Sequence, residues 1–179
     1  MSKDIKDILV SIADGNIDAL GELYAMLSVR IFNYARAVAK SNEVAEDITH
    51  DVFLQIHKQA MRLSKMENPT PYIMVITRNQ SYDYLKRDKR IVATLDEVSE
   101  ISGSPIPYNS LLIEDAFSRL PDNQRETIYL HFICGYTQKE VARIMDAPLV
   151  TVKWRCGKAL SQLQDYFSLD KEEIRNEII

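Results

Sequence analysis

Residues 135–160 read GYTQKEVARIMDAPLVTVKWRCGKAL, two short helical patterns separated by a proline. Thr137 and Glu140 have the Thr-x-x-Glu spacing of a capping box, in which each side chain accepts from the backbone N–H of the other residue. This pair predicts the start of a helix. Asp146 to Pro148 ends it, because proline cannot donate a hydrogen bond inside a helix but fits the first turn of a new one.

The second helix of this stretch has an apolar side and a basic side. Its inward positions, at helical spacing, are Val152, Cys156, Ala159, Leu160 and Leu163. Its outward positions are Thr151, Lys153, Trp154, Arg155 and Lys158. Two helices joined by a three-residue turn, the second of them basic, predict a helix-turn-helix that reads a DNA major groove. An αα-hairpin with a solvated basic face fits the same pattern.

The composition is typical of a globular helical protein. Hydrophobic residues make up 46% and charged residues 27%, and five glycines with few alternating strand patterns predict an all-α chain. The sequence has no long apolar run and no apolar signal core, so we expect neither secretion nor membrane insertion. Cys134 and Cys156 form neither a disulfide framework nor a metal-ligand spacing, which is typical of a reducing cytoplasm.

Charge is distributed in blocks, although the net charge is only −4. Residues 78–90 and 139–158 each carry a local charge of +3, whereas residues 91–118 hold five acids and no lysine or arginine. Screening confines phosphate attraction to about 10 Å at ordinary salt, so local charge matters more than the net value. Two basic patches on either side of an acidic segment therefore favour nucleic-acid binding.

Apolar spacing predicts a first unit of four helices. The first two expected helices span residues 4–12 and 17–39, and a kink near Leu27 in the second is left open. A third helix is capped by Ser41 or Asn42. A loop over residues 61–71 leads to a fourth helix, which is capped by Thr70. The third helix leaves a polar side consisting of Glu46, Asp47, Asp51 and Gln55.

The fourth helix carries a row of mixed side chains on the side away from its apolar positions. This row is Val75, Arg78, Asn79, Tyr82 and Lys86, with Arg87 beyond it. Cations interleaved with an amide and an aromatic ring suit nucleic acid with unstacked bases. A charge run alone would favour a solvated helix face, but the asparagine and the aromatic ring favour the nucleic-acid interpretation.

The sequence predicts no metal site, cofactor or catalytic group. His50 and His57 lie seven residues apart on one helix, about 10 Å, which is too far for one ion to bridge. His131 and Cys134 are three residues apart, but no two further ligands occur at suitable spacing. We therefore expect these side chains to be structural or surface residues.

An acidic segment containing Ser-Gly-Ser-Pro-Ile-Pro divides the chain. The expected parts are a domain over residues 1–90, a linker over 91–109, a second domain over 110–167 and a tail over 168–179. In the second domain a helix is predicted from Pro121 to Gly135, burying Ile128, Phe132 and Ile133. The expected fold class is all-α, with two small helical domains joined by an acidic linker.

With both units in view, the chain resembles the sigma-70 family of bacterial RNA polymerase sigma factors. Within it, the resemblance is to the short extracytoplasmic-function (ECF) group, which has only regions 2 and 4. The matching blocks are LGELY at 20–24, AEDITHDVFL at 45–54, YIxxIxRNxxxDYLKR at 72–87, LPDNQRE at 120–126, GYTQKEVA at 135–142 and TVKWR at 151–155. They occur in the family's order and extend over nearly the whole chain.

The resemblance implies a role for each polar surface of the first unit. The polar side of the third helix, with Glu46, Asp47, Asp51 and Gln55, would dock on the clamp helices of the polymerase's largest catalytic subunit. The fourth helix would open the promoter −10 element, and the loop over residues 63–70 would hold a flipped base. Phosphates are expected at Arg78, Lys86 and Arg87, and exposed bases at Asn79 and Tyr82.

The resemblance also implies the partners of the rest of the chain. The second unit would have the four-helix, winged-helix-like fold of region 4, contact the flap of the other large subunit and bind the −35 element. Its DNA contacts would be Thr151, Lys153, Trp154, Arg155 and Lys158. The acidic linker would follow the polymerase cleft, and an anti-sigma factor would hold the chain inactive. The chain would then be a specificity subunit without cofactors and not an enzyme.

Several positions depart from the family pattern. Tyr72 stands where tryptophan is common, while Pro148, Val150 and Trp154 replace a capping serine, a glycine and a small polar residue. Trp154 could stack on a sugar or a thymine methyl group, or pack on the neighbouring helix; both roles stay open. Gly157 costs its helix about 1 kcal/mol relative to alanine but leaves room for a phosphate. The promoter sequence is therefore not predicted.

Two other functions fit parts of the chain. A stand-alone helix-turn-helix regulator would explain the second unit, but it leaves residues 45–54 and the acidic linker unexplained. An enzyme is a weaker interpretation, because the sequence has no phosphate loop or nucleophile motif. Asp47 with Asp51 fits a docking face better than a catalytic carboxylate pair.

Overall fold

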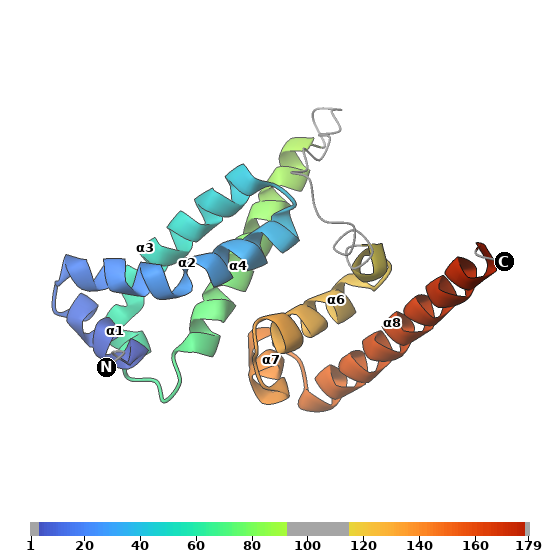
Figure 1. Cartoon of the computed structure of the whole chain (residues 1–179). Coiled ribbons are helices and arrows are strands. Elements are labelled where there is room, and N and C mark those ends of the chain that lie inside the picture. The colour runs from blue at the N-terminus through green and yellow to red at the C-terminus, as the bar shows by residue number, and fades with distance from the viewer. Residues whose placement is uncertain (1–3, 93–114, 178–179) are drawn as a thin grey trace. The chain divides into compact units, whose positions relative to one another are not determined.

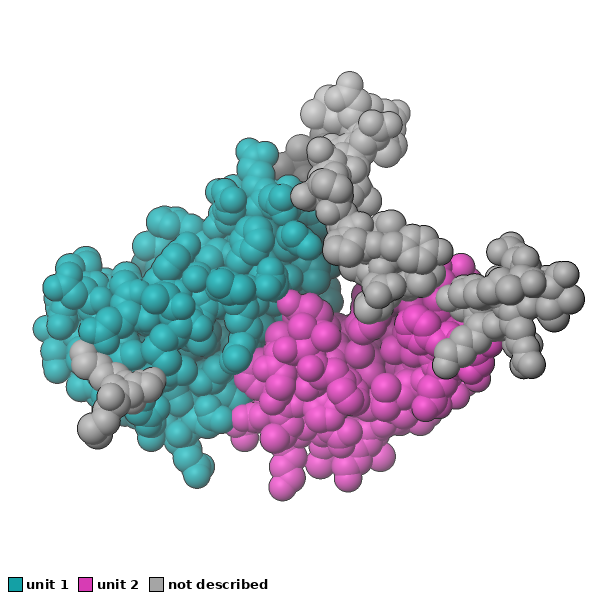
Figure 2. All heavy atoms as spheres, viewed as in Figure 1, with its two compact units in different colours: residues 1–101 teal, residues 102–179 magenta. Residues whose placement is uncertain are grey.

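The computed structural model of the chain describes residues 4–92 and 115–177, and every regular element in these two ranges is helical. The chain divides into two compact units, residues 1–101 and 102–179, coloured teal and magenta in Figure 2. This architecture confirms the predicted all-α fold class. None of the described helices has the length and hydropathy that crossing a membrane requires.

The first unit contains four helices around one apolar core (Figure 1). They are α1 (Ile5–Ala13), α2 (Ile17–Ala39), α3 (Asn42–Ser64) and α4 (Thr70–Val92). Helices α2 and α3 pack against each other, and each of them also contacts α1 and α4. Leu9, Leu23, Val52 and Ile73 contribute one buried side chain from each helix. This shared core, more than helix propensity, holds the four helices in place.

Local capping decides where three of these helices begin. The Asn16 side chain accepts from the Asp18 N–H (3.0 Å) at the start of α2, and Ser41 Oγ accepts from the Val44 N–H (3.4 Å) at the start of α3. Thr70, predicted as a cap, is instead the first residue of α4. Its N–H donates to the Asn68 side chain (3.3 Å), so Thr70 is not the cap and the helix begins one residue earlier than predicted.

The connection between α3 and α4 is shorter than the loop predicted over residues 61–71. Helix α3 continues to Ser64, whose hydroxyl donates to the Met61 carbonyl (3.0 Å), because Leu63 is buried in the core of the first unit. The loop predicted from Leu63 to Thr70 is therefore reduced to residues 65–69. Helix α4 ends at Val92, and residues 93–109 of the predicted linker lie outside the described residues.

The second unit is built on one long helix, α8 (Leu149–Glu177). The shorter α6 (Asp122–Ile128) and α7 (Gln138–Ile144) both pack against it, with the π-helical turn η1 (Tyr129–Ile133) between them. Residues 115–118 form a helical turn before α6. Helix α8 runs without interruption to Glu177, so residues 168–177 of the predicted tail extend this helix.

The burial predicted for Phe132 and Ile133 was wrong. Their side chains are 54% and 63% exposed, and Leu130 is buried instead. The reason is the π-helical turn, in which the Cys134 N–H donates to the Tyr129 carbonyl five residues earlier (3.0 Å). A π turn holds one more residue than an α turn and so shifts the following side chains around the helix axis.

Candidate nucleic-acid and protein interfaces

Helices α7 and α8 form the predicted helix-turn-helix. The capping box is complete, with the Thr137 N–H donating to Glu140 Oε2 (2.8 Å) and the Glu140 N–H donating to Thr137 Oγ1 (3.3 Å). Asp146, with a φ of 49°, turns the chain between the helices. The Pro148 carbonyl then accepts from the Val152 N–H (3.1 Å) in the first turn of α8.

The inner side of α8 is fixed by burial. Val152, Cys156 and Ala159 have almost no exposed surface. Burial raises the pKa of the Cys156 thiol, which also hydrogen-bonds to Gln138 at the start of α7, so the thiol stays neutral. Leu160, predicted on this side, is 40% exposed and faces outward. The rotation of α8 about its own axis is therefore set by three small or medium side chains.

The outer side of α8 presents all five residues predicted to contact DNA, but not equally. Lys153, Trp154 and Lys158 are exposed, whereas Thr151 and Arg155 are half-buried. At 100° per residue, Thr151 and Arg155 fall at the margin beside the core, and Lys153 falls on the opposite margin. Trp154 lies between these margins and is 61% exposed. Packing of Trp154 on the neighbouring helix, one of its two open roles, is therefore wrong.

Helix α4 presents the mixed row predicted to contact bases. Asn79 and Lys86 are exposed, and Arg78 and Tyr82 are half-buried. The Arg78 guanidinium lies over the Tyr82 ring, 4.7 Å from its centroid, so a cation–π contact keeps both side chains on the same part of the face. Arg87 is nine residues from Arg78, half a turn around the helix, and therefore lies on the other edge.

Lys86 has an acidic neighbour on α4. Its ammonium nitrogen lies 3.6 Å from the Asp83 carboxylate, and both side chains are mostly exposed. An exposed pair of this kind contributes less than about 1 kcal/mol. The pair therefore does not prevent Lys86 from contacting a phosphate.

The predicted polar side of α3 is divided by the structure. Glu46, Asp47 and Asp51 are exposed, but Gln55 is half-buried and accepts a hydrogen bond from Gln59 (3.3 Å). Glu46 and Gln55 are nine residues apart and so lie on opposite edges of the exposed face. Asp47 and Asp51 are the acids nearest its middle.

Two apolar side chains of α3, missed by the sequence reasoning, share that middle. Leu54 and Met61 are both exposed. Together with three charged residues they form a row along α3 in which successive members are four, three, four and three residues apart. We call this row the docking stripe; its members are Asp47, Asp51, Leu54, Lys58 and Met61. The alternating four-and-three spacing is visible in the sequence, but Leu54 was not assigned to a side of the helix and Met61 was expected to lie in a loop.

An open groove of about 450 Å³ runs beside the docking stripe between α2 and α3. Its lining residues are Tyr24, Ser28, Val29 and Phe32 from α2 and Glu46, Thr49 and His50 from α3. The Tyr24 ring lies 4.8 Å from the Phe53 ring, centroid to centroid, and Tyr24 is 51% exposed, so it contacts the core and still reaches the surface. The groove and the stripe together give α3 a mixed apolar and acidic surface.

His131 of η1 contacts the turn that follows it, and Cys134 is the residue directly after η1. His131 Nδ1 lies 2.6 Å from the Tyr136 carbonyl oxygen. Within residues 4–92 and 115–177, no group of three or more His, Cys, Asp or Glu side chains is arranged to hold a metal ion.

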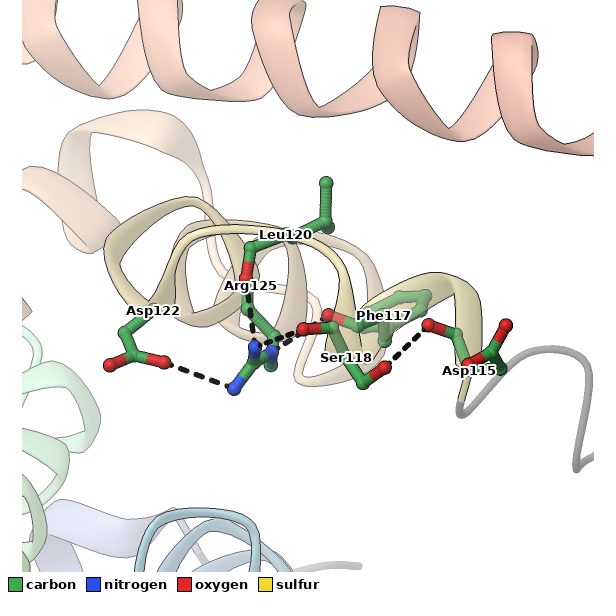
Figure 3. Close-up of polar contacts among 6 residues, drawn as sticks. All are labelled: Asp115, Phe117, Ser118, Leu120, Asp122 and Arg125. Atoms are coloured by element: carbon green, nitrogen blue, oxygen red, sulfur yellow. Dashed lines mark hydrogen bonds and ion pairs between the residues drawn. The ribbon is translucent and has the colours of Figure 1, made fainter.

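Arg125 joins the first helical turn of the second unit to α6 (Figure 3). Its Nε donates to the Phe117 carbonyl (2.7 Å), and its Nη2 donates to the carbonyls of Ser118 and Leu120 (both 2.8 Å). Its Nη1 also pairs with Asp122 (3.1 Å). Carbonyls at a helix C-terminus lack intrahelical partners, and a guanidinium supplies both donors and favourable charge. Arg125 therefore caps residues 115–118 from outside their helix.

A second contact joins that same turn to the far half of α8. The Tyr166 hydroxyl donates to Asp115 Oδ2 (2.7 Å), and the Arg119 guanidinium pairs with the same oxygen (3.0 Å) while lying over the Tyr166 ring. The Tyr166 hydrogen bond, with Arg119, holds the pKa of the Asp115 carboxyl below its ordinary value. The helical turn at residues 115–118 is thus attached at two points.

Sequence comparison assigns both units. Residues 23–91 match the profile of Sigma-70 region 2, and residues 116–165 match that of Sigma-70, region 4. The chain belongs to the sigma-70 family. Because the region 2 match covers the helices that bear the docking stripe and the mixed row of α4, a stand-alone helix-turn-helix regulator is not favoured. The chain is an RNA polymerase sigma factor.

Its relatives place this sigma factor in the ECF group. It is 25% identical over 156 residues to the ECF RNA polymerase sigma factor SigM of Bacillus subtilis, covering 80% of this chain and 94% of that protein. It is 24% identical over 176 residues to SigK of a Mycobacterium species (strain JLS), covering 92% and 91%. The fold matches the sigma factor RpoE of Bartonella quintana, solved with the anti-sigma factor NepR, with a TM-score of 0.72 at 19% identity over 86% of this chain and 99% of that one.

Proposed function

We propose that this sigma factor binds core RNA polymerase, recognises −10 and −35 promoter elements and starts transcription of a dedicated gene set. The observation that carries the proposal is the presence in one chain of a region 2 unit with an exposed docking stripe and a region 4 unit with a basic outer face. In this proposal residues 1–90 dock and open DNA, residues 91–109 connect, and residues 110–167 bind the upstream element. Such a protein works in the cytoplasm.

The docking stripe of α3 would bind the clamp helices of the largest catalytic subunit. Leu54 and Met61 supply apolar contact area, and Asp47 and Asp51 supply charge that selects a basic partner surface. Interfaces commonly gain affinity from a few apolar anchors and specificity from charge at their edges. The second unit would contact the flap of the other large subunit.

Helix α4 would hold the opened −10 element. Asn79 and Tyr82 lie where exposed bases could stack and pair, and Lys86 lies beside them to contact a phosphate. Arg78 and Arg87, on opposite edges, would each follow one side of the strand. Stacking on an aromatic ring with cations along the backbone is the usual way proteins hold single-stranded nucleic acid.

Helix α8 would enter the major groove of the −35 element. Lys153 and Lys158 are exposed for phosphates, and Thr151 and Arg155 reach the groove from the margin. The polymerase carries the chemistry, so no catalytic residue is assigned to this chain. An anti-sigma factor is also expected, because the structural relative RpoE was solved with one.

The proposal is tested by adding the full chain to core RNA polymerase and sequencing the DNA that the purified holoenzyme retains. We expect a shared two-element promoter motif, and run-off transcripts that start downstream of it only when this chain is present. A chain that never co-purifies with core enzyme yet binds a DNA motif alone would instead be a regulator. Absence of any promoter-specific transcript would sink the proposal.

The docking stripe is tested separately by charge reversal. Asp51→Lys should weaken core binding about ten-fold or more, because it places a cation against a basic surface. Asp14→Lys makes the same charge change at an exposed residue after α1, away from the stripe, and should bind normally. Equal binding by both variants would remove Asp51 from the interface.

A further inference from the structure

The most exposed part of α8 is apolar, and the polar contacts proposed above leave it unused. Val150 is 73% exposed and Trp154 is 61% exposed, although side chains of this kind gain free energy when they are buried. They are the second and sixth residues of α8, so they neighbour each other on one face at spacing i, i+4. We call this pair the apolar edge.

The core of the second unit does not use the apolar edge. Helix α8 packs against α6 and α7 through the opposite side, where Val152, Cys156 and Ala159 are buried. Trp154 takes part in no hydrogen bond, ion pair or ring contact with the residues that the structure describes. Its large indole surface is therefore available to a partner.

Charge beside the apolar edge indicates the kind of partner. Lys153 and Lys158 are both exposed, one residue before Trp154 and four residues after it. Ammonium groups in this arrangement attract phosphates, and a major groove is wide enough to admit a helix with phosphates along both rims. A duplex thus satisfies the charges while its groove covers the apolar edge.

The edges of base pairs in a major groove present mainly hydrogen-bond donors and acceptors, together with the 5-methyl group of thymine. Residues near the N-terminus of a recognition helix are the ones that reach base edges. We propose that Val150 and Trp154 pack on thymine 5-methyl groups of the −35 element and so determine part of its sequence. This inference rests on the proposed binding of that element by the second unit.

The polar residues predicted as base readers are less favourably placed. Thr151 and Arg155 are half-buried at the margin of α8, whereas the apolar edge lies in the middle of the exposed face. A contact with deoxyribose would also cover the indole, but sugars are alike at every position. Of these two apolar contacts, only the one with the methyl group makes binding depend on thymine.

The test uses holoenzyme made with the full chain and the promoter fragment that it selects. Each thymine of the −35 element is replaced in turn by deoxyuridine, which removes only the methyl group. We expect one or two replacements to weaken binding about four-fold each, the effect of losing one buried methyl group. In holoenzymes carrying Val150→Ala or Trp154→Ala, the same replacements should change binding less than two-fold.

Lys158→Ala is the matched control on the same helix. It should weaken binding to every fragment similarly and leave the deoxyuridine effect unchanged. Because Trp154 is the only tryptophan of the chain, quenching of its emission by acrylamide in the free protein also verifies its exposure. Circular dichroism of each variant confirms that its helices are intact.

The outcomes separate the inference from the function on which it rests. A deoxyuridine effect of the same size in the wild-type and both variants would overturn the inference, and so would its absence at every thymine. If Trp154→Ala lowers the affinity for every promoter sequence equally, the indole contacts the sugar backbone, and this result would also overturn the inference. Failure of the proposed function looks different, because the wild-type holoenzyme would then select no two-element promoter at all.

Discussion

Gly157 offers a perturbation whose effects on stability and on DNA binding should have opposite signs. It lies within α8, on the exposed face, three residues after Trp154. A Cβ atom at this position would meet nothing within 4 Å, so the packing of the second unit gives no reason for a glycine. Gly157→Ala should therefore raise the free energy of unfolding by about 1 kcal/mol, the difference in helix propensity.

This gain is large enough to measure. For a unit of the size of residues 102–179, 1 kcal/mol corresponds to a rise of about 4–8 °C in Tm. Thermal unfolding followed by circular dichroism would show it in the full chain. Gly21→Ala, equally open and helical but in α2, should stabilise the first unit similarly. Gly135→Ala should instead destabilise by about 1–2 kcal/mol, because its φ of +76° disfavours a side chain.

Promoter binding by holoenzyme supplies the second readout. If the absence of a side chain at Gly157 lets the DNA backbone approach α8 closely, Gly157→Ala should weaken promoter binding several-fold while the protein becomes more stable. Gly21→Ala, in the first unit, should not affect the contact with the upstream element. Unchanged affinity with the expected stabilisation would refute the close approach. If Gly157→Ala does not raise the free energy of unfolding, the conclusion that α8 has room for a side chain at this position is refuted.

Other contacts of the second unit make further predictions. In Arg125→Lys the ammonium cannot reproduce the three hydrogen bonds to carbonyls, because it lacks the guanidinium fork. Denaturant melts should show the free energy of unfolding lowered by about 2–3 kcal/mol. An unchanged unfolding midpoint would contradict the capping role. Tyr166→Phe should raise the pKa of Asp115, measured by NMR titration. Because the pKa of Asp115 is lowered in the folded state, its contact with Tyr166 stabilises the fold at neutral pH. This stabilisation is lost as the pH falls and the carboxylate is protonated. The free energies of unfolding of the wild type and Tyr166→Phe should therefore converge in acid. Lys153→Ala should reduce the salt slope of promoter binding by about one, and a slope equal to that of the wild type would exclude a phosphate contact. Arg155→Ala should relax preference at one base pair by about 1–3 kcal/mol, whereas equal losses on every sequence would reject a base contact.

Local signals in the sequence were sufficient for most helices. The Thr137–Glu140 capping box and the Ser41 cap act within four residues, so the pattern and the structure coincide there. The apolar repeat of α2 likewise predicted a helix over residues 17–39 and left a kink near Leu27 open; the structure has one helix from Ile17 to Ala39. Where hydrogen bonding is local, a sequence pattern determines the element directly.

Features set by tertiary packing were predicted less well. Leu63 extends α3 because it is buried among other helices, which its own neighbours in sequence do not reveal. Phe132 was assigned inward on an α-helical period, whereas the π turn shifts that period. The first error concerns where a helix ends, and the second concerns which side of a helix faces the core.

The exposed apolar residues of the two units differ in the charge that surrounds them. On α3, Asp47 and Asp51 precede Leu54 along the docking stripe and Lys58 follows it, so acids are in excess there, whereas on α8 Trp154 lies beside Lys153 and Lys158. An inhibitor that covers both surfaces must therefore present apolar groups with basic neighbours to α3 and with acidic neighbours to α8. A single segment of one charge would be attracted to one surface and repelled by the other. We therefore expect an anti-sigma factor of this chain to use two segments of opposite charge, so that Asp51→Lys and Lys153→Glu each weaken its binding independently and additively.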